Sequence, residues 1–184
     1  MRHRKWAYLA AAWAITFAAP HIYWATGRTD GLGTSLSDRI VDDANLGMAL
    51  LCAAIAAFCL CGAAVAFGTV GSWPIRMASV ARRAILGLVW FGAALLVVRS
   101  VDIFIEFNLG LTGVWDVPAE ERDNYLHLAR WFMFFWLPCF VLGAVAWTGL
   151  AWTYSRGSRA GIGVDDFASS QSALRSSYST SPAS

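Results

Sequence analysis

AILGLVWFGAALLVVRSVDIFIEFNLG, residues 84–110, is an apolar stretch that carries three charged side chains. On a helix with about 100° between residues, Arg99, Asp102 and Glu106 fall within roughly 60° of one another. Ionisable groups at membrane depth cost about 2.5 to 3.5 kcal/mol each on insertion scales, and they persist where they pair or have a role. The stretch therefore predicts a transmembrane helix whose charged face points inward at a packed neighbour and away from lipid.

The composition of the whole chain is typical of an integral membrane protein. Of its 184 residues, 58% are hydrophobic and 14% are charged, a more apolar balance than a soluble domain of this length requires. The formal net charge of +2 comes from scattered basic residues, which argues against nucleic acid as a partner. All four cysteines lie in apolar runs, which argues against a secreted disulfide framework.

Apolar runs predict an all-α membrane protein, a four-helix transmembrane bundle within residues 1–154. Its helices are expected at about residues 6–25, 46–70, 84–108 and 125–154. The first has a basic start, so a signal peptide cleaved near Ala18 and Ala19 is the alternative to a retained helix. The second is dense in alanine and glycine and is expected to be the central packing helix. Residues 155–184 are rich in serine and glycine, which predicts a disordered cytoplasmic tail.

The distribution of lysine and arginine predicts the orientation of the four spans. Three basic residues lie in the loops after the first and third helices: Arg28, Arg39 and Arg122. Nine lie on the opposite side: Arg2, Arg4, Lys5, Arg76, Arg82, Arg83, Arg156, Arg159 and Arg175. Because positive charge favours the cytoplasmic side, we expect a plasma-membrane protein with both termini in the cytoplasm.

Polar and aromatic residues from three of the predicted helices converge near the outer interface. Arg99 lies ~22 Å along its helix from Ala84, level with the end of the first helix and the start of the fourth. The predicted ligand-binding set is His21, Tyr23, Trp24, Arg99, Asp102, Glu106, His127, Arg130 and Trp131. No catalytic role and no metal site is assigned to them.

Each member of this set also has a structural interpretation. Arg99 and Asp102, three residues apart, can pair to neutralise a buried charge and fix helix register. Glu106 can emerge into headgroup water, and the tryptophans can be interface anchors. His21 and His127 could together hold a haem iron or relay a proton, although two histidines without a third ligand more often form interface hydrogen bonds.

Two short motifs resemble a known family. The sequence His21-Ile22-Tyr23-Trp24-Ala25-Thr26-Gly27 is similar to the His-x-Tyr-Trp-Ala-x-Gly end of the first helix in the bacterial membrane family catalogued as domain of unknown function 3995. Residues 136–143, WLPCFVLG, resemble that family's Trp-Glu-Pro stretch and Leu-Gly, with Leu137 in place of the glutamate and Arg28 in place of a second glycine. The resemblance implies a four-helix membrane protein and supplies no activity.

Three functional hypotheses follow from these patterns. The leading one is a non-enzymatic protein that binds a lipid-like ligand, another membrane protein or a second copy of itself at its outer half. The second is a membrane enzyme or redox subunit that acts on a lipid or quinone, with Asp102 or Glu106 and a histidine as acid and base. The third is a small transporter, against which the other three helices offer no ionisable side chain at mid-membrane depth.

Overall fold

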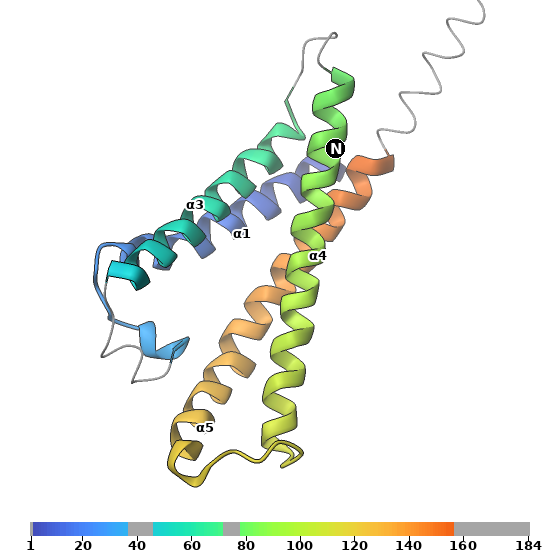
Figure 1. The fold of residues 1–184 in the computed structure, drawn as a ribbon. Coiled ribbons are helices and arrows are strands. Elements are labelled where there is room, and N and C mark those ends of the chain that lie inside the picture. Colours follow the sequence, from blue (N-terminus) through green and yellow to red (C-terminus); the bar gives the residue numbers. More distant parts are fainter. Residues whose placement is uncertain (1, 37–45, 72–77, 157–184) are drawn as a thin grey trace, which may run out of the picture.

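A computed structural model describes residues 2–36, 46–71 and 78–156, and every regular element in these ranges is helical (Figure 1). The long elements are α1 (Arg2–Ala25), α3 (Leu46–Gly68), α4 (Ala78–Leu111) and α5 (Arg122–Trp131). Short 3-10 turns, η1 (Leu32–Thr34) and η2 (Ala119–Glu121), precede α3 and α5, and a π-helix, η3 (Phe132–Trp136), leads from α5 into a helix over residues 137–156. The predicted tail beyond residue 156 and part of the first polar loop, residues 37–45, lie outside the described ranges.

α1 and α4 begin before their predicted first residues, whereas α3 ends at Gly68, two residues before its predicted end. α4 begins at Ala78 instead of residue 84, because the alanines and arginines before the apolar run are good helix formers although they give no hydrophobic signal. α1 continues through Pro20 to Ala25. Pro138 lies inside the last helix, and the five-residue π-helix directly before it lets the chain accommodate a residue that has no backbone N–H.

Three helices are long and apolar enough to cross a membrane: Leu46–Gly68, Val80–Leu111 and Ala119–Arg156. Length and composition therefore identify a membrane protein with at least three candidate spans among the described residues. α1 is not one of these three. Its 24 residues include a proline, two histidines and several tryptophan and tyrosine side chains, which lower its mean hydropathy.

α3 packs along α1, and the contact surface consists of small side chains (Figure 1). On α1 the buried residues form a stripe of alanines followed by two larger side chains. They are Ala7, Ala10, Ala11, Ala14, Ala18, His21 and Trp24. Small residues let helix backbones approach closely, as predicted for the second span. The expectation that this span is the central helix is wrong, because α3 contacts α4 much less and leaves its outer face exposed. Residues 137–156 contribute to a core shared with α1, α3 and α4.

Tryptophan side chains seated on glycines join the helices at the end of the molecule near the N-terminus. The ring of Trp147 lies between Gly62 of α3 and Gly92 of α4, where an added Cβ would come within 3.3 Å and 2.8 Å of the ring. Trp13 of α1 covers Gly143 in the same way, and its indole N–H donates to the carbonyl oxygen of Cys139 at 2.8 Å. These contacts fix the crossing of the two helix pairs at this end.

The two helix pairs diverge at the opposite end. Figure 1 shows α1 and α3 running away from α4 toward η1, while α5 lies between the lower end of α4 and η1, which it contacts. The core divides accordingly into one cluster around Trp24, Leu32, Cys52 and Trp136 and another around Ile103, Phe107 and Ala129. Trp136 of the last helix belongs to the first cluster, so the two pairs still meet at this end, and a hollow lies between them.

Candidate ligand cavity

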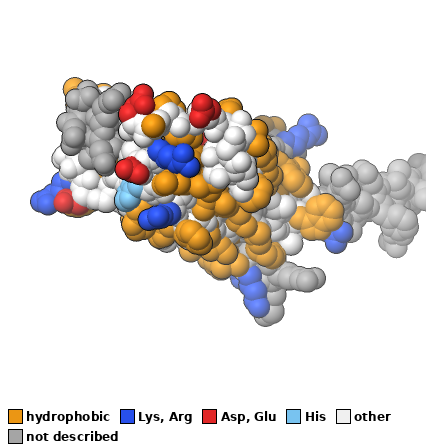
Figure 2. Space-filling view, turned by 90° about the horizontal axis from the view of Figure 1, so that it is seen from below, with side chains coloured by type: hydrophobic (Ala, Val, Ile, Leu, Met, Phe, Trp, Pro, Cys, Tyr) orange, Lys and Arg blue, Asp and Glu red, His pale blue; other side chains and the backbone are white. Residues whose placement is uncertain are grey.

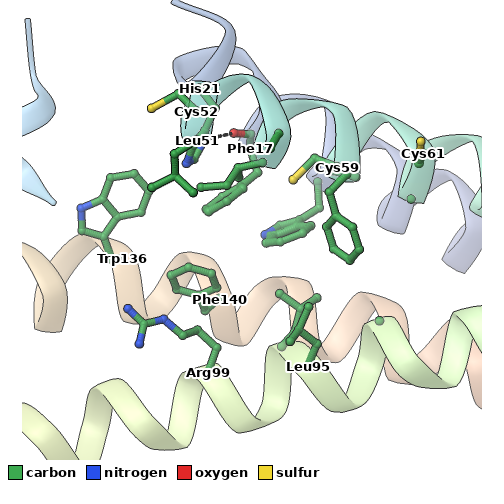
Figure 3. Close-up of a pocket in the computed structure, with 18 of the residues that line it drawn as sticks. Phe17, His21, Leu51, Cys52, Cys59, Cys61, Leu95, Arg99, Trp136 and Phe140 are labelled. Atoms are coloured by element: carbon green, nitrogen blue, oxygen red, sulfur yellow. Dashed lines mark hydrogen bonds between the residues drawn. The ribbon is translucent and has the colours of Figure 1, made fainter. Parts of the chain in front are cut away.

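A cavity of about 740 Å³ lies between α1 and α3 on one side and α4 and residues 132–147 on the other (Figure 3). Its volume lies within the range of ~300–1,000 Å³ that is typical of small-molecule sites. The walls are apolar and aromatic along most of their length. The lining side chains on which the argument depends are Phe17, His21, Trp24, Leu36, Leu51, Cys52, Phe58, Phe91, Leu95, Arg99, Trp136, Phe140 and Trp147.

Phe17 is the centre of the aromatic wall. Its ring stacks on Trp13 with a centroid distance of 5.0 Å and meets Phe140 at 5.2 Å and Trp136 at 5.9 Å. Edge-to-face and offset contacts of this kind add to the packing of large rings. Residues from α1 and from the last helix are thus held in one continuous apolar surface.

The segment containing η1 closes the end of the cavity near Trp24. Leu32 is 2% exposed and packs against Trp24, while Leu36 lines the cavity. Two indole N–H groups hold this segment: Trp24 donates to the carbonyl oxygen of Asp30 at 2.9 Å, and Trp136 donates to that of Thr34 at 2.9 Å. The tryptophans of both family-like motifs therefore bind one loop.

His21 is buried at the same end of the cavity. Its Nδ1–H donates to the carbonyl oxygen of Phe17 at 2.9 Å, which leaves Nε2 as the nitrogen that can meet another group. Its ring also contacts those of Phe17 and Trp24, with centroid distances of 4.9 Å and 5.3 Å. His21 is therefore fixed in orientation, as expected of an interface histidine with a hydrogen bond.

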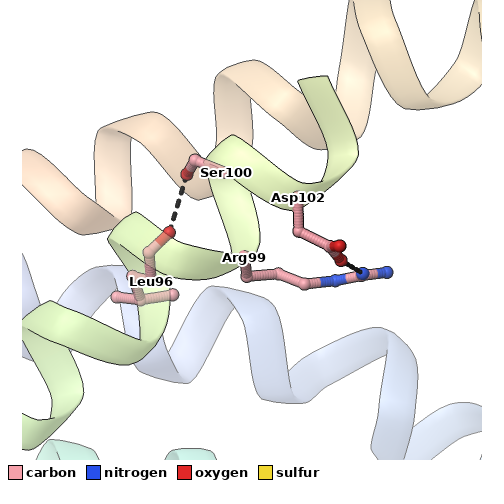
Figure 4. A network of polar contacts seen from close by, with 4 residues as sticks. All are labelled: Leu96, Arg99, Ser100 and Asp102. Atoms are coloured by element: carbon pink, nitrogen blue, oxygen red, sulfur yellow. Dashed lines mark hydrogen bonds and ion pairs between the residues drawn. The ribbon is translucent and has the colours of Figure 1, made fainter. Parts of the chain in front are cut away.

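The charged face of α4 differs from its predicted environment. Arg99 pairs with Asp102 as the i, i+3 spacing predicts, but their side chains are 43% and 55% exposed (Figure 4). Glu106 is exposed as well. The expectation that this face packs against a neighbour is wrong: Arg99 borders the cavity, and Asp102 and Glu106 are exposed. The packed face lies one residue further along the helix, with Val89, Ala93, Leu96, Ser100, Ile103 and Phe107. A helical wheel shows which residues share a face of the helix, but it does not show which face packs against a neighbouring helix.

Arg99 is the one predicted charged residue that lines the cavity. In Figure 3 its side chain extends from α4 toward Trp136, at the end of the cavity where His21 also lies. Its guanidinium group contacts one carboxylate oxygen of Asp102, and the structure gives it no other hydrogen-bond partner among the described residues. No aspartate or glutamate from the described ranges lines the cavity.

The remaining candidate residues lie outside the cavity. Tyr23 faces the loop and donates its hydroxyl hydrogen to the Asp30 carboxylate at 2.6 Å. His127, Arg130 and Trp131 are exposed on α5. Figure 2 shows this end of the molecule, where acidic, basic and histidine side chains gather beside hydrophobic flanks. The structure thus brings three of the nine candidates, His21, Trp24 and Arg99, to one cavity.

The paired histidines of the haem hypothesis differ in setting. His21 is buried beside the cavity, whereas His127 is exposed on α5. In the part of the chain that the structure describes, no three His, Cys, Asp or Glu residues form a group that could hold a metal ion. Among the residues that the structure describes, the cavity has apolar walls and one cationic side chain at its end, and no acid and base face each other across it.

The cavity is open on its α3 and α4 side. Leu51 and Phe58 on α3, and Phe91 and Leu95 on α4, line it and are also exposed at the surface. These two helices make few contacts with each other, which leaves the opening between them. In a bilayer, an opening between two apolar helices faces hydrocarbon.

Sequence reasoning did not identify most of the cavity wall. Phe17, Phe140 and the α3 residues are apolar, and apolar residues in an apolar helix carry no pattern that separates a packed face from a cavity wall. The only signal was the pair of motifs around Trp24 and Trp136. The divergence of the helix pairs that creates the cavity is a tertiary feature.

The comparisons with known proteins give one match. The family model described as "Protein of unknown function (DUF3995)" matches residues 14–147, a range that contains the cavity-lining residues named above. No curated protein and no solved structure matches the chain.

Proposed function

We propose that this chain, which belongs to the family described as "Protein of unknown function (DUF3995)", is a four-span plasma-membrane protein that binds a lipid-like ligand. Both termini are in the cytoplasm in this proposal, as the lysine and arginine distribution favours. The observation that carries the proposal is the apolar cavity between the helix pairs, open between α3 and α4.

The outer face of α1 supports its place as a fourth span. Leu9, Ile15 and Ile22 are large hydrophobic side chains that are about half exposed. A 24-residue helix is ~36 Å long, which exceeds the ~30 Å hydrocarbon core of a bilayer. With lipid around it, this face would be buried together with the exposed apolar faces of the other three spans.

The enclosed shape favours a lipid-like ligand over a partner protein. Aromatic rings on several sides and a loop across the end form a concave volume, whereas a partner helix would require a continuous groove or a flat face. A hydrophobic compound can reach this volume from the bilayer through the opening between α3 and α4, without crossing a polar surface.

Native mass spectrometry of the full chain purified in a mild detergent tests the proposal. We expect the protein to retain endogenous lipid or to bind added hexadecanol, a single-chain probe. Ala54→Trp places a large ring in the cavity from α3 and should abolish this binding. Leu60→Trp lies on the same helix, is exposed and does not line the cavity, so it is the matched control and should bind normally.

Two results would contradict lipid binding in the cavity. One is a wild-type protein that binds neither endogenous lipid nor hexadecanol above the detergent background. The other is equal binding by Ala54→Trp and Leu60→Trp, which would mean that the bound molecules coat the outer surface. Circular dichroism of both variants verifies that the helices are intact.

A further inference from the structure

We propose that the ligand of this cavity is a single-chain amphiphile with an anionic head group, bound with its head at Arg99 and its tail directed toward Trp147. This inference rests on the proposed function and specifies the chemical class of the ligand. It depends on three observations: the charge of the lining, the limited pairing of Arg99 and the extent of the cavity along α4.

The charge of the lining is the first observation. Arg99 is the only charged side chain among the described residues that line the cavity, and no carboxylate lines it. His21, at the same end, adds no negative charge to the lining. The positive guanidinium group of Arg99 would attract an anionic head group placed there and would repel a cationic one. Guanidinium groups bind carboxylate and phosphate oxygens through paired N–H donors, and a partly desolvated site strengthens such bonds.

The pairing of Arg99 leaves capacity for this anion. Arginine has five N–H donors, and the structure shows one contact between Arg99 Nη1 and Asp102 Oδ2. Asp102 is more than half exposed and lies outside the cavity lining, so it does not block the approach from inside. The ion pair holds the guanidinium group at the outer end of the cavity while most of its donors stay available.

The extent of the cavity indicates one hydrocarbon chain. Its lining on α4 runs from Leu88 to Arg99, which is ~16 Å at ~1.5 Å per residue. This is about half of a ~30 Å hydrocarbon core, the depth of one leaflet. A tail placed along this path would pass Leu95 and end near Trp147 and Gly92, where the helix pairs close together. With the proposed orientation, the ligand comes from the outer leaflet.

Binding of three probes with the same tail tests the head-group preference. Palmitate, hexadecanol and hexadecyltrimethylammonium are titrated into the purified full chain, at a pH at which palmitate is ionised, and apparent Kd values are read by native mass spectrometry. Because hydrogen bonds to charged groups are stronger than neutral ones, palmitate should bind about tenfold more tightly than hexadecanol. The cationic probe should bind more weakly than both.

Two substitutions with opposite expected effects locate the head group. Arg99→Gln should remove the preference for palmitate, so that this variant binds palmitate no more tightly than it binds hexadecanol. Asp102→Asn removes the competing carboxylate and should tighten palmitate binding, so the inference stays testable if Arg99→Gln does not fold. Arg122→Gln, an exposed arginine at the start of α5, is the control and should behave as wild type.

The outcomes separate this inference from the proposed function. If hexadecanol binding is sensitive to Ala54→Trp but palmitate binds no more tightly, the anionic head group is refuted and the lipid-binding cavity stands. If Arg99→Gln keeps the full palmitate preference, the head group is not at Arg99. If no probe binds, both the inference and the proposed function fail.

Discussion

Single side chains in this protein tie distant parts of the sequence together through indole N–H groups. Trp136 reaches a loop carbonyl 102 positions earlier in the chain, and Trp24 binds the same loop from the end of α1. Trp147, by contrast, is the one side chain in the described ranges with a buried N–H that has no partner. These three residues are all large and buried, but only two of them secure the η1 segment.

Trp136→Phe should loosen the η1 segment specifically. The substitution leaves the carbonyl oxygen of Thr34 without its donor, and a lost hydrogen bond of this kind costs about 0.5 to 1.5 kcal/mol. We expect faster hydrogen exchange at residues 32–36 in detergent-solubilised protein. Trp147→Phe removes the same ring atoms but no hydrogen bond, and it should leave exchange in this segment unchanged. Equal exchange in the two variants would contradict the anchoring role of Trp136.

Replacing both Arg99 and Asp102 by leucine should have little effect on stability. The pair is about half exposed, and exposed ion pairs contribute about 0 to 1 kcal/mol. We therefore expect the free energy of unfolding in detergent to change by no more than about 1 kcal/mol. A loss of several kcal/mol would mean that the pair is a structural element, as its spacing alone also allowed. Thermal unfolding monitored by circular dichroism provides the measurement.

At the scale of helices, close packing depends on glycines that accept aromatic rings. Gly62, Gly92, Gly143 and Gly149 each lie against a tryptophan ring, so an added methyl group would overlap or press on that ring. Without a hydrophobic driving force in lipid, van der Waals contact of this kind is a main source of helix association. Sequence analysis identified the small residues of α3, but it could not assign their tryptophan partners on other helices.

Gly143→Ala should therefore destabilise the protein, and Gly87→Ala should not. A Cβ at Gly143 would overlap the ring of Trp13, and overpacking of a tight contact costs about 1 to 3 kcal/mol. Nothing lies within 4 Å of a Cβ at Gly87, where alanine should gain up to about 1 kcal/mol from helix propensity. Melting temperatures of the two variants, measured side by side, check this. Similar values would mean that Trp13 moves aside freely.

At the scale of the whole molecule, the open question about the membrane is whether α1 crosses it. Among the described residues, three helices are long and apolar enough to cross a membrane, and α1 would be a fourth span. The exposed apolar face of α1 and the basic residues before it both favour a crossing with the N-terminus inside.

Cysteine labelling at two positions decides between these topologies. In a cysteine-free background, Thr29→Cys should react with a membrane-impermeant maleimide added to spheroplasts, because the loop after α1 is expected outside. Lys5→Cys should react only after lysis if α1 crosses the membrane. Labelling of Lys5→Cys in intact spheroplasts would place both ends of α1 on the same side and leave three spans. Glu120→Cys, in the predicted second outer loop, is the positive control.

The sequence by itself determined that the chain is helical, that it carries several membrane-length apolar segments, which family it belongs to and that Arg99 and Asp102 can pair. These properties are local, because composition, hydropathy and i, i+3 spacing depend on neighbours along the chain. Only the tertiary structure decided which face of α4 is buried, that α3 lies at the edge, and that the helix pairs diverge around a cavity. Those properties depend on how Trp13 and Trp147 fit glycines on other helices, and contacts between remote side chains have no periodic signature in an apolar sequence.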